Sequence, residues 1–135
     1  MTSFNPYPYT ISKDHAALIL RRKAFFEAAV ERVADIVPEC SQLWCYGLNA
    51  LRPMKPSSDW DFIAFVPEQV SNERIDLLND ISGPLSEFRL IGNQTLDVGV
   101  MRIDDGSPCA RLVRTEGFCF WQLQISLAAR DRRCA

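Results

Sequence analysis

Apolar residues near the start of the chain recur at the spacing of a helix. Ser12 precedes this pattern and is a residue type that caps helix N-termini, whereas Pro38 follows it and cannot extend a helix. The pattern therefore predicts a single helix from Lys13 to Val37. Its apolar stripe is expected to contain Leu18, Phe25, Ala29, Val33 and Ile36.

Four apolar stretches further along the chain predict strands. Leu43–Tyr46 is short and rich in aromatic residues, and it ends at a glycine. Trp60–Val66 is almost continuously apolar, which is typical of an interior strand covered on both faces. In Gln94–Ile103 apolar residues alternate with polar or small ones, a period of two. Phe118–Gln122 is the fourth predicted strand.

A second helix is predicted between the second and third of these strands, from Ser71 to Phe88. Ser71 is its expected N-cap, and Gly83-Pro84 is expected to interrupt it. Its apolar face is expected to contain Ile75, Leu78, Ile81 and Leu85.

Two more helices are predicted near the end of the chain. One covers Pro108–Thr115, with Ser107 as N-cap and Gly117 in the left-handed conformation that ends many helices. The other is a basic C-terminal helix over 123–135. Together with the strands, these helices predict an α/β (α+β) fold in which a small mixed sheet is flanked by helices.

Composition places the chain among ordinary globular proteins. Its 135 residues are 47% hydrophobic and 24% charged, which suits a single domain over 1–135 with a core at about 13–123. A net charge of −2 gives no reason to expect a nucleic-acid partner.

The cysteines and the apolar runs bear on where the protein works. The five cysteines contain no CxxC pair and no cluster with zinc spacing, so we expect free thiols in a reducing cytoplasm. No window approaches 18 consecutive apolar residues, and the N-terminus lacks a basic stretch followed by an apolar run. We therefore expect a cytoplasmic protein without a membrane span.

Two acids at the start of the second strand are the first candidates for chemistry. Asp59 and Asp61 are two positions apart on a strand, so they point to one face while Trp60 points to the other. Like charges so placed repel, and hard oxygen ligands at this spacing suit Mg²⁺. An Asp-x-Asp pair also arises by chance, so its surroundings decide what it means.

Those surroundings add a glycine turn and a third acid. Gly47 ends a buried strand and opens a loop, where the missing side chain lets backbone N–H groups approach a phosphate. Asp97 faces away from its core neighbours Leu96 and Val98, and Gly99 is expected to leave space beside it. Three carboxylates on two strands beside such a turn predict a two-metal site for phosphoryl transfer.

At these residues the sequence resembles the minimal nucleotidyltransferase family of the DNA polymerase β-like superfamily. That family carries a Gly-Ser pair, ten intervening residues, an Asp-x-Asp pair, and a third Asp on a later strand. Here Gly47-Leu48, the ten residues from Asn49 to Ser58, and Asp59-Trp60-Asp61 reproduce the spacing, and Asp97 follows. Ala50 falls on the usual alanine of the motif.

The late part of the chain is also similar to this family. Ala110–Phe118 looks like the family's late helix, Arg-Glu-Gly turn and closing strand, with Thr115 inserted between Arg114 and Glu116. The resemblance covers roughly residues 15–123. Arg111 and Arg114 share one face of the helix, and we expect that face to point at the active-site groove.

The chain departs from the family's pattern in its phosphate-binding loop. Leu48 replaces the serine whose hydroxyl would contact the outer phosphates, and Leu51-Arg52 replaces the customary Arg-Gly. Backbone N–H groups at Leu48 and Asn49 are expected to hold phosphate instead, with side-chain contacts from Asn49, Arg52 or Lys55. The candidate nucleotide-binding residues are Gly47, Leu48, Asn49, Arg52 and Ser58.

The resemblance implies a Mg²⁺-dependent transferase that uses ATP or another nucleoside triphosphate. Asp59 and Asp61 would hold the metal ions that grip the triphosphate, and Asp97 would complete the second metal site and activate the acceptor hydroxyl. Attack on the α-phosphorus would transfer a nucleoside monophosphate, with AMP expected, and release pyrophosphate.

The resemblance also implies a partner protein. Minimal family members are often antitoxins that adenylylate a toxin of the HEPN ribonuclease type, so a cognate toxin is the expected acceptor, and association into oligomers is left open. Because Leu48 replaces the motif serine, the alternative is a degenerate antitoxin-like module that neutralises a toxin by contact. A regulatory domain that senses nucleotide without turnover is a third interpretation.

Overall fold

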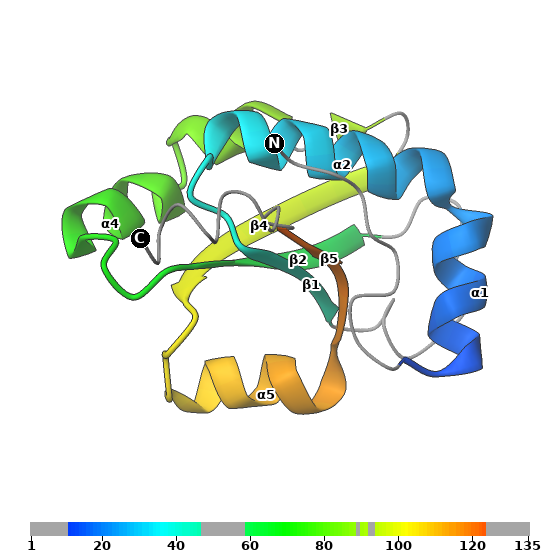
Figure 1. Cartoon of the computed structure of the whole chain (residues 1–135). Helices are drawn as coiled ribbons and strands as arrows, with labels where there is room; N and C mark the ends of the chain where they lie inside the picture. Colours follow the sequence, from blue (N-terminus) through cyan, green and yellow to red (C-terminus); the bar gives the residue numbers. More distant parts are fainter. Residues whose placement is uncertain (1–10, 47–58, 89, 92–93, 124–135) are drawn as a thin grey trace, which may run out of the picture.

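A five-stranded mixed sheet, with the strand order β3-β4-β2-β1-β5, forms the centre of the fold (Figure 1). The structure, a computed structural model, describes residues 11–46, 59–88, 90–91 and 94–123, without the side chains of 59, 87, 88, 90, 91 and 94. β2 runs parallel to β4 and antiparallel to β1, which confirms the predicted mixed sheet. The strands are β1 (Gln42–Tyr46), β2 (Asp59–Val66), β3 (Leu90–Ile91), β4 (Gln94–Arg102) and β5 (Phe118–Gln122).

Helices cover both faces of the sheet, with α2 on one side and α5 on the other (Figure 1). The alternation along β2 explains this arrangement, because Trp60 and Phe62 pack with Phe26 of α2, whereas Ile63 and Phe65 pack with Val113 of α5. The helices are α1 (Lys13–Arg21), α2 (Lys23–Ile36), α4 (Asn72–Asn79), the 3₁₀ helix η1 (Pro84–Phe88) and α5 (Pro108–Glu116).

The first helix is broken, so the prediction of one continuous helix over 13–37 was wrong. Between α1 and α2, Arg22 has φ −115° and ψ 32°, outside the helical region. In a continuous helix Arg22 would lie on the apolar stripe between Leu18 and Phe25, both of which are buried. The break lets both segments bury their apolar residues, and α1 turns away from α2 (Figure 1).

The three helix caps predicted from serine residues are confirmed. In each case the serine hydroxyl accepts a hydrogen bond from the backbone N–H three residues later, which satisfies one of the free donors at the helix start. The pairs are Ser12 with His15 at 3.1 Å, Ser71 with Arg74 at 3.1 Å, and Ser107 with Ala110 at 3.2 Å.

The second predicted helix is shorter than its pattern suggested. α4 ends at Asn79 because Asp80 is extended, with φ −62° and ψ 133°, and the chain resumes as η1 only at Pro84. Ile81, expected on the apolar face, is 80% exposed as a result, whereas Leu78 and Leu85 are buried as expected. The short strand β3 was not predicted.

Gly117 ends α5 for a different reason from the one predicted. Its φ of −96° and ψ of −172° are extended, not left-handed. A Cβ at this position would lie 2.6 Å from the carbonyl oxygens of both Cys45 and Val113. Glycine is therefore needed here because α5 and β1 approach closely.

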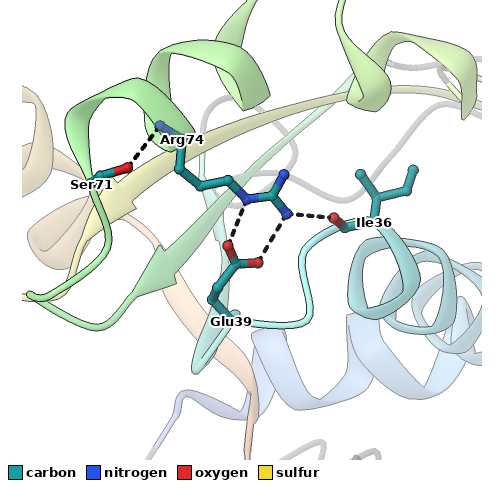
Figure 2. Close-up of polar contacts among 4 residues, drawn as sticks. All are labelled: Ile36, Glu39, Ser71 and Arg74. Atoms are coloured by element: carbon teal, nitrogen blue, oxygen red, sulfur yellow. Dashed lines mark hydrogen bonds and ion pairs between the residues drawn. The ribbon is translucent and has the colours of Figure 1, made fainter.

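A forked ion pair joins the end of α2 to α4 (Figure 2). Arg74 donates from Nε to Glu39 at 2.6 Å and from Nη2 to the second carboxylate oxygen at 3.1 Å. The same Nη2 donates to the carbonyl of Ile36 at 3.1 Å, in the last turn of α2. A cation at the C-terminus of a helix also interacts favourably with the helix dipole.

Two further sequence predictions concern the C-terminal helix and the absence of a membrane span. The basic C-terminal helix lies almost wholly in residues 124–135, outside the described residues. Within the described part of the chain, no helix has the length and apolar character needed to cross a membrane.

Candidate functional site

Asp61 and Asp97 occupy paired positions on the two central parallel strands. In the register between β2 and β4, Asp61 is the direct partner of Asp97. Partners on adjacent strands lie about 4.8 Å apart and point to the same face, which here is the face covered by α5. Asp61 is half-buried and Asp97 is exposed. Two of the three predicted acids are thus brought together.

The charge of Asp61 acts on the end of β1 beside it. Tyr46 is the partner of Asp61 in the β1–β2 register. Burial first, and then the negative charge of Asp61, raises the pKa of the Tyr46 hydroxyl. The same two causes raise the pKa of the buried Cys45 thiol. Both groups therefore stay protonated beside Asp61, and Tyr46, which the sequence analysis did not single out, borders the site.

The third acid is placed only by its backbone. Asp59 begins β2 and pairs with Thr95, but its side chain lies outside the description. Gly47, Leu48, Asn49, Arg52 and Ser58 also lie outside the described residues. Among the groups that are described, no three His, Cys, Asp or Glu side chains gather as a metal site. The complete triad and the phosphate-binding loop therefore stay predictions.

Asp61 and Asp97 fit a divalent cation. Carboxylates on directly paired strand positions are close enough to share one ion, since Mg²⁺ takes oxygen ligands at about 2.1 Å. Two like charges placed side by side also repel, and a cation between them relieves that repulsion.

Two expectations about residues around the acids were wrong. The space beside Gly99 is filled, because a Cβ there would lie 3.1 Å from Cδ1 of Ile63. Arg114 does not point at the groove. Its guanidinium donates to the carbonyls of Asp105 and Ile103, each at 2.7 Å, and lies 4.8 Å from the centre of the Phe65 ring. Arg114 therefore holds the turn between β4 and α5.

A cavity of about 300 Å³ opens beside Asp97 at the outer edge of β4. Asp97 contributes to its wall together with residues from the end of α4 and the turn that follows. The cavity was not predicted from the sequence, because Asn79 and Asp80 look like ordinary helix-ending residues. The only signal was their position shortly before the strand that carries Asp97.

Comparisons with known proteins support the fold. No family model matches the sequence, and no curated protein matches it. Among solved structures, one described as the crystal structure of a toxin-antitoxin with AMP-PNP superposes with a TM-score of 0.52 at 14% identity. The match covers 80% of this chain and 77% of that chain. At this identity the likeness shows a shared fold.

Proposed function

We propose that this chain is a Mg²⁺-dependent nucleotidyltransferase of the minimal type, which transfers a nucleoside monophosphate from ATP to a hydroxyl. The observation that carries the proposal is the direct pairing of Asp61 with Asp97 in the N-terminal halves of the parallel strands β2 and β4. Parallel interior strands are normally apolar, so two adjacent acids there call for a functional explanation.

The residues take the following roles in this proposal. Asp59, Asp61 and Asp97 bind Mg²⁺, which when present neutralises the triphosphate and the charge that develops during transfer. Asp97 faces the acceptor and accepts the proton of its hydroxyl. Gly47, Leu48 and Asn49 orient the phosphates through backbone N–H groups, with Arg52 and Ser58 as further nucleotide-binding residues of the loop.

We further propose that the acceptor belongs to a partner protein within a toxin-antitoxin module, a HEPN-type toxin in the first instance. The support is the sequence resemblance together with the shared fold of a toxin-antitoxin structure that contains AMP-PNP. Four of the cysteines are free thiols, which supports a cytoplasmic location.

A second candidate function is a non-catalytic antitoxin that neutralises its partner by contact. One specific observation favours it, namely Leu48 in place of the motif serine. The two functions predict different results for Leu48→Ser, which restores the hydroxyl. The substitution raises transfer if the site is catalytic and changes nothing if the site is degenerate.

Thermal unfolding with each nucleoside triphosphate, with and without Mg²⁺, tests nucleotide binding. Ligand at a hundredfold excess over its dissociation constant adds about 2.7 kcal/mol, or about 10 °C for a domain of this size. The shift is expected with Mg²⁺ and is lost in Asp61→Asn and Asp97→Asn. Asp104→Asn is the matched control, because Asp104 is an exposed acid in the turn that follows β4.

Radiolabel position separates transfer from other uses of ATP. Label in the α-phosphate is expected to appear on a co-expressed partner protein, whereas label in the γ-phosphate is not. Transfer of the γ-label, or the absence of a Mg²⁺-dependent shift with every triphosphate, contradicts the proposed activity.

A further inference from the structure

One wall of the cavity beside Asp97 is a stretch of the β4 edge that no described strand covers. Asn79 donates from its side-chain amide to the Val100 carbonyl at 3.0 Å and accepts from the Val100 N–H at 2.8 Å. The outer edge of β4 is thus covered by Asn79 at Val100 and by β3 as far as Thr95. Between these two points lies Val98, which lines the cavity.

The backbone of Val98 faces this cavity, as the alternation along β4 shows. Val100 turns its N–H and carbonyl outward to Asn79, whereas the N–H of Ile103 bonds inward to the carbonyl of Val66 on β2, at 2.7 Å. Even-numbered residues of β4 therefore direct their backbone groups to the outer edge. Val98 presents a donor and an acceptor there, as in strand edges that bind extended peptides.

The lining of the cavity is apolar and acidic. Leu78, Leu85 and Leu96 are the apolar residues of its lining, and Asp80 and Asp97 are the acidic ones, with the side chain of Asp97 on the face of the sheet covered by α5. None of the described residues that line it carries a positive charge. Hydrogen bonds from the N–H and hydroxyl of Ser82, both at 2.9 Å, lower the pKa of the Asp80 carboxyl, so this group is ionised at neutral pH.

An exposed apolar side chain stands at the rim. Ile81 lines the cavity and is 80% exposed, the largest value among the exposed large apolar residues of the described chain. A side chain of this kind loses water contact only when another molecule covers it.

We infer that this cavity binds an extended, basic segment of the partner protein that pairs with the edge of β4. Because side chains of a paired strand alternate between the two faces of the sheet, the hydroxyl of the segment lies next to Asp97 on the face covered by α5, and its neighbours lie in the cavity. The segment pairs with the backbone of Val98, places an apolar side chain against Ile81 and Leu85, and sets a Lys or Arg beside Asp80. This inference rests on the proposed function for the role of Asp97, and it adds where the acceptor enters and which sequence it carries.

Short synthetic peptides serve as probes for this site. Two peptides, each with a Leu next to a Ser, differ only in a neighbouring Lys or Glu, and their binding to the full ¹⁵N-labelled chain is followed by NMR titration. The Lys peptide is expected to bind about ten-fold more tightly, about 1.4 kcal/mol, and to shift the Val98 amide signal. Asp80→Asn keeps the hydrogen-bond acceptor for Ser82 but removes the charge, so it is expected to reduce this preference.

Matched variants test the apolar contact without disturbing the core. Ile81→Glu is expected to weaken binding of the Lys peptide about ten-fold. Leu20→Glu changes a similarly exposed residue on α1, at 61% exposure, and Asp76→Asn an exposed acid on α4 outside the cavity, and both are expected to have no effect.

Several outcomes overturn the inference. These are equal binding of the two peptides, no binding at millimolar concentration, an unmoved Val98 signal, or equal effects of Ile81→Glu and Leu20→Glu. The inference is also overturned if the protein forms a dimer that dissociates in Ile81→Glu, because the cavity then binds a second copy of the chain. The nucleotide experiment is read separately, because a lost Mg²⁺-ATP shift with intact peptide preference contradicts the transferase and supports the peptide site.

Discussion

Asn79 completes the edge of β4 in place of a neighbouring strand. Its amide makes both hydrogen bonds that a strand would make to Val100, at 2.8 and 3.0 Å. The residue thereby fixes the end of α4 against the strand that carries Asp97.

Asn79→Ala is expected to lower the free energy of unfolding by about 2 to 3 kcal/mol, because the N–H and the carbonyl of Val100 both lose their partners. Urea unfolding measures the change. Asn72→Ala is the control, since Asn72 also accepts a side-chain hydrogen bond, from Arg102, but at an exposed position. A similar loss in both variants contradicts the special role of Asn79.

The Arg74–Glu39 pair is expected to make stability depend on acid pH. The hydrogen bonds from Arg74 hold the pKa of Glu39 below its ordinary value of 4.5, against the opposing effect of burial. A carboxyl whose pKa is lower in the folded chain stabilises it above the unfolded value, and that contribution is lost as pH falls through the folded value. Glu39→Gln should cost about 1 kcal/mol at neutral pH.

The difference between wild type and Glu39→Gln should disappear as pH falls below 4.5 toward the folded-state pKa. Unfolding curves at neutral and acid pH measure it. Glu68→Gln is the control, because Glu68 takes part in none of the ion pairs among the described residues. A constant difference across the whole range would show that charge on Glu39 is not what matters.

Gly117→Ala is expected to destabilise the protein by about 3 kcal/mol or to prevent folding, because the new Cβ meets two carbonyl oxygens at 2.6 Å. Gly106→Ala is the matched control, as a Cβ there meets nothing within 4 Å. Thermal unfolding of the two variants decides the matter. Equal melting temperatures would contradict the close approach of α5 to β1.

Asp61→Asn and Asp97→Asn are expected to leave stability unchanged or raise it by about 0.5 kcal/mol in metal-free buffer, because each removes a like charge from a directly paired strand position. Chelator-treated protein is unfolded by urea to measure this. The same variants lose the Mg²⁺-dependent shift with nucleotide. A large loss of stability without metal would instead assign the acids a structural role.

Alkylation is expected to distinguish Cys109 from the buried thiols. Cys109 is exposed, whereas burial raises the pKa of Cys40 and of Cys119 to about 12 and suppresses their thiolate form. Iodoacetamide at neutral pH should therefore modify Cys109 in the folded protein and reach Cys40, Cys45 and Cys119 only after denaturation. Peptide mass mapping reads this out.

Local patterns were sufficient to predict most of the elements. The four predicted strands are present because three are short apolar runs and the fourth, over 94–103, alternates apolar with polar or small residues. The serine caps are present because their hydroxyls satisfy nearby N–H groups. The break at Arg22 was predictable only by noticing that a charged residue would interrupt the apolar stripe. The need for glycine at position 117 depends on the approach of the Cys45 carbonyl of β1, which a single-sequence pattern does not contain.

In the candidate site too, local patterns predicted some features and missed those that depend on contacts between distant segments. Alternation along each strand predicted which face Asp61 and Asp97 share, but their direct pairing depends on the register that β2 and β4 adopt across the intervening segment. The predicted direction of the Arg114 side chain was wrong, because helical periodicity does not show that the carbonyls of Ile103 and Asp105 lie nearby. The roles of Asp59 and of the loop residues 47–58 stay predictions.

Because β2 pairs in parallel with β4, the residues that hold the two acids and the residues that line the cavity lie mostly in different segments of the chain. Asp61 and Asp97 are held in register by the strands themselves, whereas α4, the turn at Asp80 and η1 belong to the crossover that connects those strands. The crossover can therefore change in length and sequence while the distance between the two acids stays the same. Exchange of residues 67–93 between relatives of this fold should transfer the choice of partner and leave nucleotide use unaltered.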